Sequence, residues 1–201
     1  MLNLIRKDMI LQKKTLPFML LFLFIYLFVN VSTSWVAIVF CIVIIMNAFQ
    51  TDETSSANLL LNSLPYTRKE IVSSKYIGAL IFIFLTLLTI FIGNWMIHRE
   101  IMQWEVLLFI TSIVMGLISF AFPFSYLFNS KYLLIGFGGV FVVYMVTLSF
   151  IPNLNDRVRE VVQTVLSLDN SLFYIGIILS VGLLYVLSWI LSIQIYSRKV
   201  F

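Results

Sequence analysis

The sequence predicts an all-α integral membrane protein with six transmembrane helices, and three observations carry this prediction. Hydrophobic residues make up 61% of the 201 residues and charged residues 11%, against roughly 45–50% and about 25% in soluble domains. Uncharged stretches about as long as a bilayer is thick recur along the chain. The basic residues gather in alternate connecting segments, which indicates an orientation across the membrane.

The composition also excludes several other classes of protein. Intrinsic disorder requires low hydrophobicity and high charge, and the chain has the reverse. A disulfide scaffold requires paired cysteines, but Cys41 is the single cysteine. A membrane β-barrel requires strands of alternating polarity, whereas runs such as residues 79–85 are apolar at every position. Helices are therefore the elements expected to cross the bilayer.

Five stretches without Asp, Glu, Lys or Arg are long enough to hold spanning helices. A crossing helix needs about 20 apolar residues, each adding about 1.5 Å. Four of the stretches hold one helix each, and they cover residues 76–98, 106–130, 132–155 and 170–197. The other stretch, residues 15–51, has 37 residues and a polar break at 30–34. We expect it to form a tight hairpin of two helices near residues 15–31 and 32–50.

The basic residues place both chain termini in the cytoplasm. With this orientation the cytoplasmic segments hold 10 of the 13 Lys and Arg residues, and the outer segments hold 3. Membrane topology and contact with anionic lipid account for this bias, so no nucleic-acid partner is expected. The N-terminal segment has the charge pattern of a signal peptide, but no small-residue cleavage site follows, so we expect it to be retained.

Two segments outside the spans have short amphipathic patterns. Residues 1–14 are basic and place apolar side chains near one helical face, which favours an interfacial helix over a plain cytosolic flank. These side chains are Leu2, Ile5, Met9 and Leu16. Residues 152–170 place valines and a leucine at helical spacing, which predicts a short external helix. A lid packed on the bundle is favoured there over part of an exit gate.

The segment 51–75 is the long cytoplasmic connection, and it contains two predicted helix starts. Asp52 and Glu53 open its first part, where carboxylates favour the positive end of a short helix. Pro65 ends that helix, and Thr67 with Glu70 matches a capping box that begins the next one. This next helix is expected to continue into the third span. Thirty helical residues correspond to about 45 Å, which exceeds the roughly 30 Å thickness of the hydrocarbon core. About two turns of this helix would therefore project into the cytoplasm.

The same segment carries a cluster of leucines that needs cover from water. The cluster consists of Leu59, Leu60, Leu61 and Leu64. The membrane surface, the rest of the chain or a partner protein would each provide that cover, and the composition does not choose among them.

Catalytic and metal-binding residues are scarce. His98 stands at a span end and is the single histidine, so with one cysteine the chain lacks a zinc cluster. Neither a Gly-x-Ser-x-Gly elbow nor a Gly-x-x-x-x-Gly-Lys phosphate loop is present. No Asp, Glu, Lys or Arg lies deep in a predicted span, which disfavours an ion-coupled carrier. The chain is therefore expected not to be an enzyme and to hold no metal or cofactor of its own.

The residues from Phe49 to Leu80 resemble the permease subunits of type-2 ATP-binding-cassette (ABC) exporters, especially short bacterial ones with six spans. In that family the second span is followed by an acidic segment, a leucine pair, Ser-Leu-Pro, a charged cluster and a lysine at the entry to the third span. The matching residues follow in this order: Asp52-Glu53, Leu59-Leu60-Leu61, Ser63-Leu64-Pro65, Arg68-Lys69-Glu70 and Ser74-Lys75-Tyr76. Ser55-Ser56 stands where the family usually has a glycine.

The resemblance implies a mechanism. Segment 51–75 would hold a coupling helix that docks on a separate cytosolic ABC ATPase, which would bind the ATP. The implied docking residues are Asp52, Glu53, Leu59, Leu60, Leu61, Leu64, Pro65, Arg68, Lys69, Glu70 and Lys75. The permease would pair with a second copy or a sister permease in the bacterial cytoplasmic membrane. Its implied function is export of a peptide, a lipid or a hydrophobic drug.

Two alternative functions stand beside this one. A substrate-binding membrane subunit of a vitamin uptake system has a similar size, but such subunits carry an Ala-x-x-x-Ala docking motif that the first span lacks. An accessory or immunity membrane protein would act without an ATPase. Dependence on an ATPase partner therefore separates the transporter subunit from a protein that acts alone.

Overall fold

The computed structural model describes residues 2–28, 33–54, 67–99, 102–128 and 171–198, together with isolated positions between 132 and 164. In the continuous ranges the chain is helical, as predicted. The helices are α1 (Leu2–Leu11), α2 (Thr15–Tyr26), α3 (Thr33–Thr54), α5 (Arg68–His98), α6 (Trp104–Leu127) and α9 (Ser171–Arg198).

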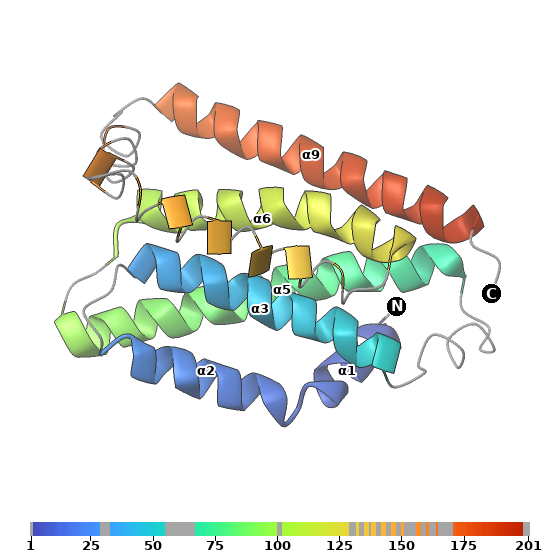
Figure 1. Cartoon of the computed structure of the whole chain (residues 1–201), viewed down its shortest axis with the longest axis horizontal. Coiled ribbons are helices and arrows are strands. Elements are labelled where there is room, and N and C mark those ends of the chain that lie inside the picture. The colour runs from blue at the N-terminus through green and yellow to red at the C-terminus, as the bar shows by residue number, and fades with distance from the viewer. Residues whose placement is uncertain are drawn as a thin grey trace.

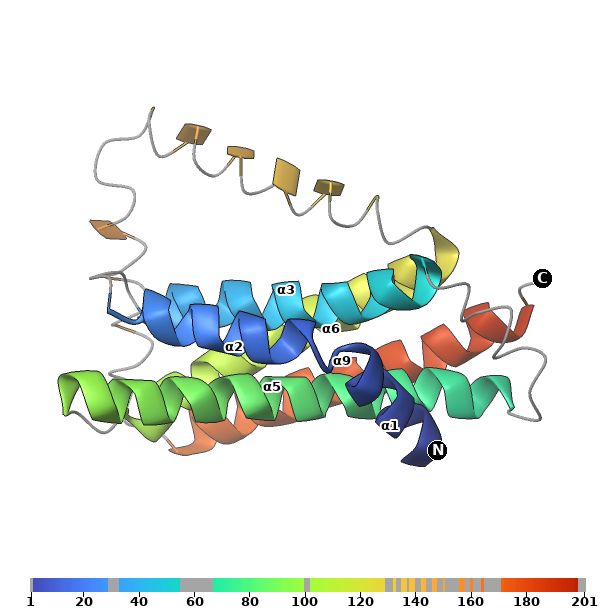
Figure 2. The same ribbon diagram turned by 90° about the horizontal axis from the view of Figure 1, so that it is seen from below.

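Five of these helices run side by side as a bundle, and α1 lies across the bundle near one end (Figures 1 and 2). The most extensive contact joins α6 and α9, while α5 packs against α9 and α3, and α2 packs against α3 and α5. The core between them contains side chains that are at most 1% exposed, such as Ile44, Ile90 and Val114. The starts of α1 and α5 and the end of α9 lie at the same end of the bundle (Figure 1).

Three helices are long and apolar enough to cross a membrane, and they correspond to the third, fourth and sixth predicted spans. They are Arg68–Ile97 of α5, Trp104–Leu127 of α6 and Phe173–Arg198 of α9. The predicted hairpin before them appears as α2 and α3. Here α2 meets the criterion only together with α1, from which it is bent by 61°, and the apolar part of α3 is the shorter stretch Val36–Asn47.

Other parts of the predicted architecture lie outside the continuous described residues. These parts are the span at 132–155, the external helix at 152–170 and most of the segment between α3 and α5. The count of six spans and the cytoplasmic position of the termini stay predictions.

The predicted place of Asp52 and Glu53 at the start of a helix is wrong, whereas the rest of that predicted short helix lies outside the described residues. Asp52 and Glu53 lie in the last turn of α3, and not in the first turn of a separate helix. No proline or glycine stands between Thr33 and Thr54, so nothing in the sequence ends this helix before the acidic pair.

Candidate functional site

A capping box fixes the first turn of α5, within the predicted docking segment 51–75. Thr67 is the N-cap residue and has an extended backbone. The backbone N–H of Glu70 donates to Thr67 Oγ1 at 3.3 Å, and the backbone N–H of Thr67 donates to a Glu70 carboxylate oxygen at 2.9 Å. The predicted capping box and the unbroken helix that follows it are both confirmed. A helix of 31 residues thus links this point to the far end of the bundle.

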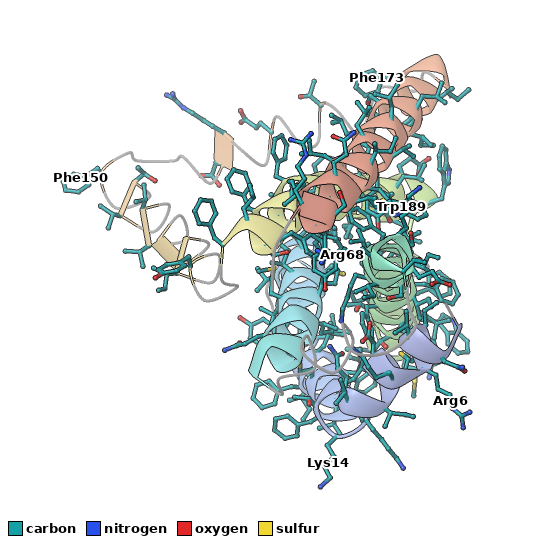
Figure 3. All side chains as sticks on the ribbon, turned by 90° about the vertical axis from the view of Figure 1, so that its right-hand side faces the viewer. Arg6, Lys14, Arg68, Phe150, Phe173 and Trp189 are labelled. Atoms are coloured by element: carbon teal, nitrogen blue, oxygen red, sulfur yellow. The ribbon has the colours of Figure 1, made fainter. Side chains whose placement is uncertain are left out.

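Arg68 joins the start of α5 to the end of α9. Its Nη1 donates to the backbone carbonyl of Tyr196 at 2.9 Å, and its guanidinium carbon lies 5.9 Å from the centre of the Tyr196 ring. The carbonyls in the last turn of a helix lack helical partners and carry partial negative charge, so a cation there is favourable. Figure 3 shows Arg68 at this end of the bundle, next to α9.

The other predicted docking residues fall into three groups. Lys69 is exposed and Glu70 is partly exposed beside Arg68. Asp52 and Glu53 are placed by their backbone, at the end of α3. The remaining apolar members lie outside the described residues, and they are Leu59, Leu60, Leu61, Leu64 and Pro65. Their joint role in docking stays a prediction.

Lys75 differs from the other predicted docking residues because it is buried. Only 8% of this residue is exposed, and its Nζ lies 3.0 Å from Asp8 Oδ1 on α1. Lys7 lies 3.1 Å from the same oxygen. Asp8 is 5% exposed, so the Asp8–Lys75 pair ties α1 to α5 away from water. Lys75 therefore contacts this chain's own N-terminal helix instead of presenting its charge at the surface.

Hydroxyl groups form a second link, the Tyr76 network, which joins α5, α6 and α9. It comprises the hydroxyls of Tyr76, Ser188 and Ser192 and the carbonyl of Ser119. Ser188 Oγ donates to that carbonyl at 2.6 Å, and the Tyr76 hydroxyl lies 2.7 Å from Ser188 Oγ and 2.8 Å from Ser192 Oγ. Pro123 explains why the Ser119 carbonyl accepts a hydrogen bond from Ser188. It has no N–H and stands four residues after Ser119 in α6, so the carbonyl lacks its normal helical donor.

Counting protons gives the direction of each hydrogen bond in the Tyr76 network. Each hydroxyl has one proton to donate. The proton of Ser188 is used on the carbonyl of α6, so Tyr76 donates to Ser188, and Ser192 in turn donates to Tyr76. All three hydroxyl-bearing residues are buried. The chain of bonds therefore uses every hydroxyl proton, as a water-free interior requires.

Sequence reasoning missed Tyr76 as the centre of this network. Aromatic packing also surrounds the Tyr76 ring, with Phe122 at 4.8 Å edge-on and Trp189 stacked at 5.8 Å between centroids. Two signals were present in the sequence. A proline inside an apolar span frees a carbonyl, and serines four residues apart on another span offer donors on one face.

A family model described as "ABC-2 family transporter protein" matches residues 3–197, which is nearly the whole chain. The chain belongs to the ABC-2 transporter family. Neither the curated proteins nor the solved structures contain a match to it. The family suspected from segment 51–75 is therefore confirmed, and this ABC-2 chain is a multi-pass membrane permease subunit of an ABC transporter.

Membership of the ABC-2 family implies an ABC ATPase as partner. It favours the permease over both alternatives, the uptake subunit and the accessory protein. In the described part of this permease, no group of three or more His, Cys, Asp and Glu side chains is placed to hold a metal ion.

The ABC-2 permease also has an open groove of about 420 Å³ between α6 and α9. Most of its wall is apolar, with Phe120, Phe124 and Leu187 among the lining side chains. Ser188 and Gln194 add polar groups, so the groove runs beside the Tyr76 network. The arrangement offers a surface for apolar molecules and no reactive group.

Proposed function

We propose that this ABC-2 permease is an exporter subunit, moved by a separate ABC ATPase that docks on segment 51–75 and binds the ATP. The permease itself catalyses no reaction in this proposal. It works as a dimer with a second copy or a sister permease in the bacterial cytoplasmic membrane. The proposed cargo is a peptide, a lipid or a hydrophobic drug.

The start of α5 is the observation that supports this coupling. The helix begins at Arg68, inside the proposed docking segment, and runs 31 residues through the bundle. Arg68 bonds the end of α9, and Lys75 pairs with α1 inside the protein. Because α5 is one unbroken helix that is bonded to two other helices near its start, a displacement of the docking segment would move α5, α9 and α1 together. The apolar groove between α6 and α9 supports a hydrophobic cargo.

Co-purification tests the docking. The tagged permease is expressed with candidate ABC ATPases of the same genome, beginning with the one encoded nearest, and bound ATPase activity is measured after purification. We expect the double variant Leu60→Asp/Leu64→Asp to lose the ATPase, because charges replace the apolar side chains that the partner would cover. The matched variant Leu60→Met/Leu64→Met keeps the apolar character and is expected to retain it. Normal ATPase binding by the Asp variant, inserted at the wild-type level, would refute docking on this segment.

Transport direction requires a second experiment. In inside-out vesicles that contain the complete complex, an exporter accumulates a hydrophobic fluorescent dye when ATP is added outside. Uptake of the dye only in right-side-out vesicles would contradict export while leaving the docking result intact.

A further inference from the structure

The α1 helix presents separate faces to the bundle and away from it. Its buried residues are Leu4 and Asp8, four positions apart, and Gln12 in the turn that follows continues this spacing on the side that meets α5. Met9 and Ile10 lie off this face and are 36% and 59% exposed. Packing within the chain therefore leaves apolar side chains of α1 uncovered.

The exposed charges of α1 and of the turn after it are all positive. Asp8 is the single acidic residue in the first 51 positions, and it is buried against Lys75. The side chains of Arg6, Lys13 and Lys14 are exposed. Figure 3 shows Arg6 and Lys14 pointing away from the bundle. Because the one carboxylate of this segment is withdrawn into the protein, α1 and the turn after it offer no exposed acidic side chain beside the three cations.

The bend between α1 and α2 indicates the depth at which these cations lie. α2 (Thr15–Tyr26) contains no charged residue and belongs in the apolar part of the membrane. The axes of α1 and α2 differ by 61°. With α2 set along the membrane normal, as for a spanning helix, α1 would lie closer to the membrane plane than to that normal. Figure 2 shows α1 crossing α5, while α2 runs along the bundle. The turn with Lys13 and Lys14 is thus at the level of the lipid headgroups.

We propose that α1 and this turn form a binding site for anionic lipid headgroups. Arg6, Lys13 and Lys14 contact the headgroup phosphates, while Met9 and Ile10 lie at the boundary with the acyl chains. Basic side chains combined with an apolar face are what binding to an anionic surface requires. The site is independent of ATPase docking, so either proposal can fail while the other stands.

The test uses the full-length permease in a nonionic detergent. Dioleoylphosphatidylglycerol or dioleoylphosphatidylcholine is added at equal mole fractions, and lipid retained per chain is measured by mass spectrometry together with the midpoint of thermal unfolding. We expect the phosphatidylglycerol to be retained and to raise the midpoint, and the phosphatidylcholine to do neither. Equal retention of the two lipids would overturn the proposal, as would equal stabilisation by inorganic phosphate.

Variants that change the charges of Arg6, Lys13 and Lys14 test whether these residues bind the lipid headgroup. Each cation near an anionic surface contributes about fivefold in affinity, so Arg6→Gln/Lys13→Gln/Lys14→Gln is expected to weaken retention by up to about 100-fold. Arg6→Lys/Lys13→Arg/Lys14→Arg keeps the charge and should keep binding. The matched control Arg99→Gln/Arg198→Gln removes exposed cations at other helix ends and is expected to bind as the wild type does. Wild-type retention by the triple Gln variant overturns the proposal, and so does loss of binding in the charge-conserving variant.

A measurement on the unaltered chain applies even if the triple Gln variant does not fold. Raising the salt concentration from about 0.1 M to about 1 M shortens the screening length from about 10 Å to about 3 Å. Retention of phosphatidylglycerol should then fall by at least about tenfold. Retention that does not change with salt would show that the acyl chains, and not the cations, bind the lipid, and would overturn the proposal. An acidic protein bound at these cations in place of lipid would overturn it too.

Discussion

The hydrogen bond from Ser188 to the carbonyl of Ser119 can be used to test the polar link between α5, α6 and α9. Pro123 removes the helical donor to this carbonyl, and Ser188 of α9 replaces that donor at 2.6 Å. We predict that Ser188→Ala destabilises the protein strongly when Pro123 is present and weakly when Pro123→Ala is present as well. Alanine at position 123 restores an N–H four residues after the carbonyl, so the helix satisfies it without help.

The expected magnitudes follow from the bonds that each variant loses. In the wild-type background Ser188→Ala leaves a buried carbonyl without a donor, which costs about 1–3 kcal/mol. It also removes the bond from the Tyr76 hydroxyl, about 0.6 kcal/mol for a typical hydrogen bond between membrane helices. Tyr76 still has Ser192 within 2.8 Å, so it retains a partner. In the Pro123→Ala background the carbonyl cost disappears, and about 0.6–1 kcal/mol remains. The two backgrounds should therefore differ by the cost of the unpaired carbonyl, about 1–3 kcal/mol.

Reversible unfolding by sodium dodecyl sulfate in mixed micelles measures this difference. Tryptophan fluorescence and helical circular dichroism should report the same transition, because two-state unfolding is required to convert midpoints to free energies. Ser180→Ala is a matched control on the same helix, since its hydroxyl is exposed and donates only to the carbonyl of Ile177 at 2.9 Å. If Ser188→Ala costs the same in both backgrounds, the proline does not create the need for this donor and the reasoning is refuted.

Three further predictions use the same unfolding titration or hydrogen exchange. Lys75→Met leaves a buried carboxylate with one half-exposed lysine and should cost about 3 kcal/mol. The double variant Asp8→Asn/Lys75→Met should recover most of that loss, and no recovery would contradict a paired buried charge. A Cβ at Gly93 collides with the end of the Leu27 side chain, directly after α2, so this side chain must move and Gly93→Ala should cost about 1 kcal/mol. By contrast, a Cβ at Gly116 meets nothing within 4 Å among the described residues, so Gly116→Ala should not destabilise the protein. Arg68→Gln removes the cation at the end of α9, and amide exchange in the last turn should quicken about fivefold, whereas unchanged exchange would contradict the cap.

The sequence was sufficient for the features that depend on local chemistry. The capping box of Thr67 and Glu70 needs only residues three positions apart, so its spacing predicts the start of α5. The length of that helix follows from the absence of a proline between Arg68 and His98, while Gly78 and Gly93 are tolerated inside it. The apolar stretches similarly predict α6 and α9 to within a few residues at each end.

The features that the sequence did not reveal depend on contacts between distant positions. Asp8 and Lys75 stand 67 positions apart, and each looks like a surface charge in its own segment. Asp52 has the residue type of a helix start, but the undisturbed helix before it decides its place in the last turn of α3. Acidic residues typical of a first helical turn are weak evidence for a new helix when no proline or glycine ends the helix before them.

The placement of the polar contacts along α5 has a mechanical consequence. Arg68, Lys75 and Tyr76 lie within nine positions, and each bonds another helix through a polar or ionic group. Beyond Tyr76, Thr86 and Thr89 donate to carbonyls of their own helix, and Thr86 also forms a weak hydrogen bond with the Cys41 thiol of α3. Polar bonds in an apolar interior are directional and costly to break, whereas apolar contacts between helices shift at little cost. The first two to three turns of α5 should therefore move as one body with α1 and the end of α9. Repacking between states of the permease is then expected in the far half of α5, where apolar contacts dominate.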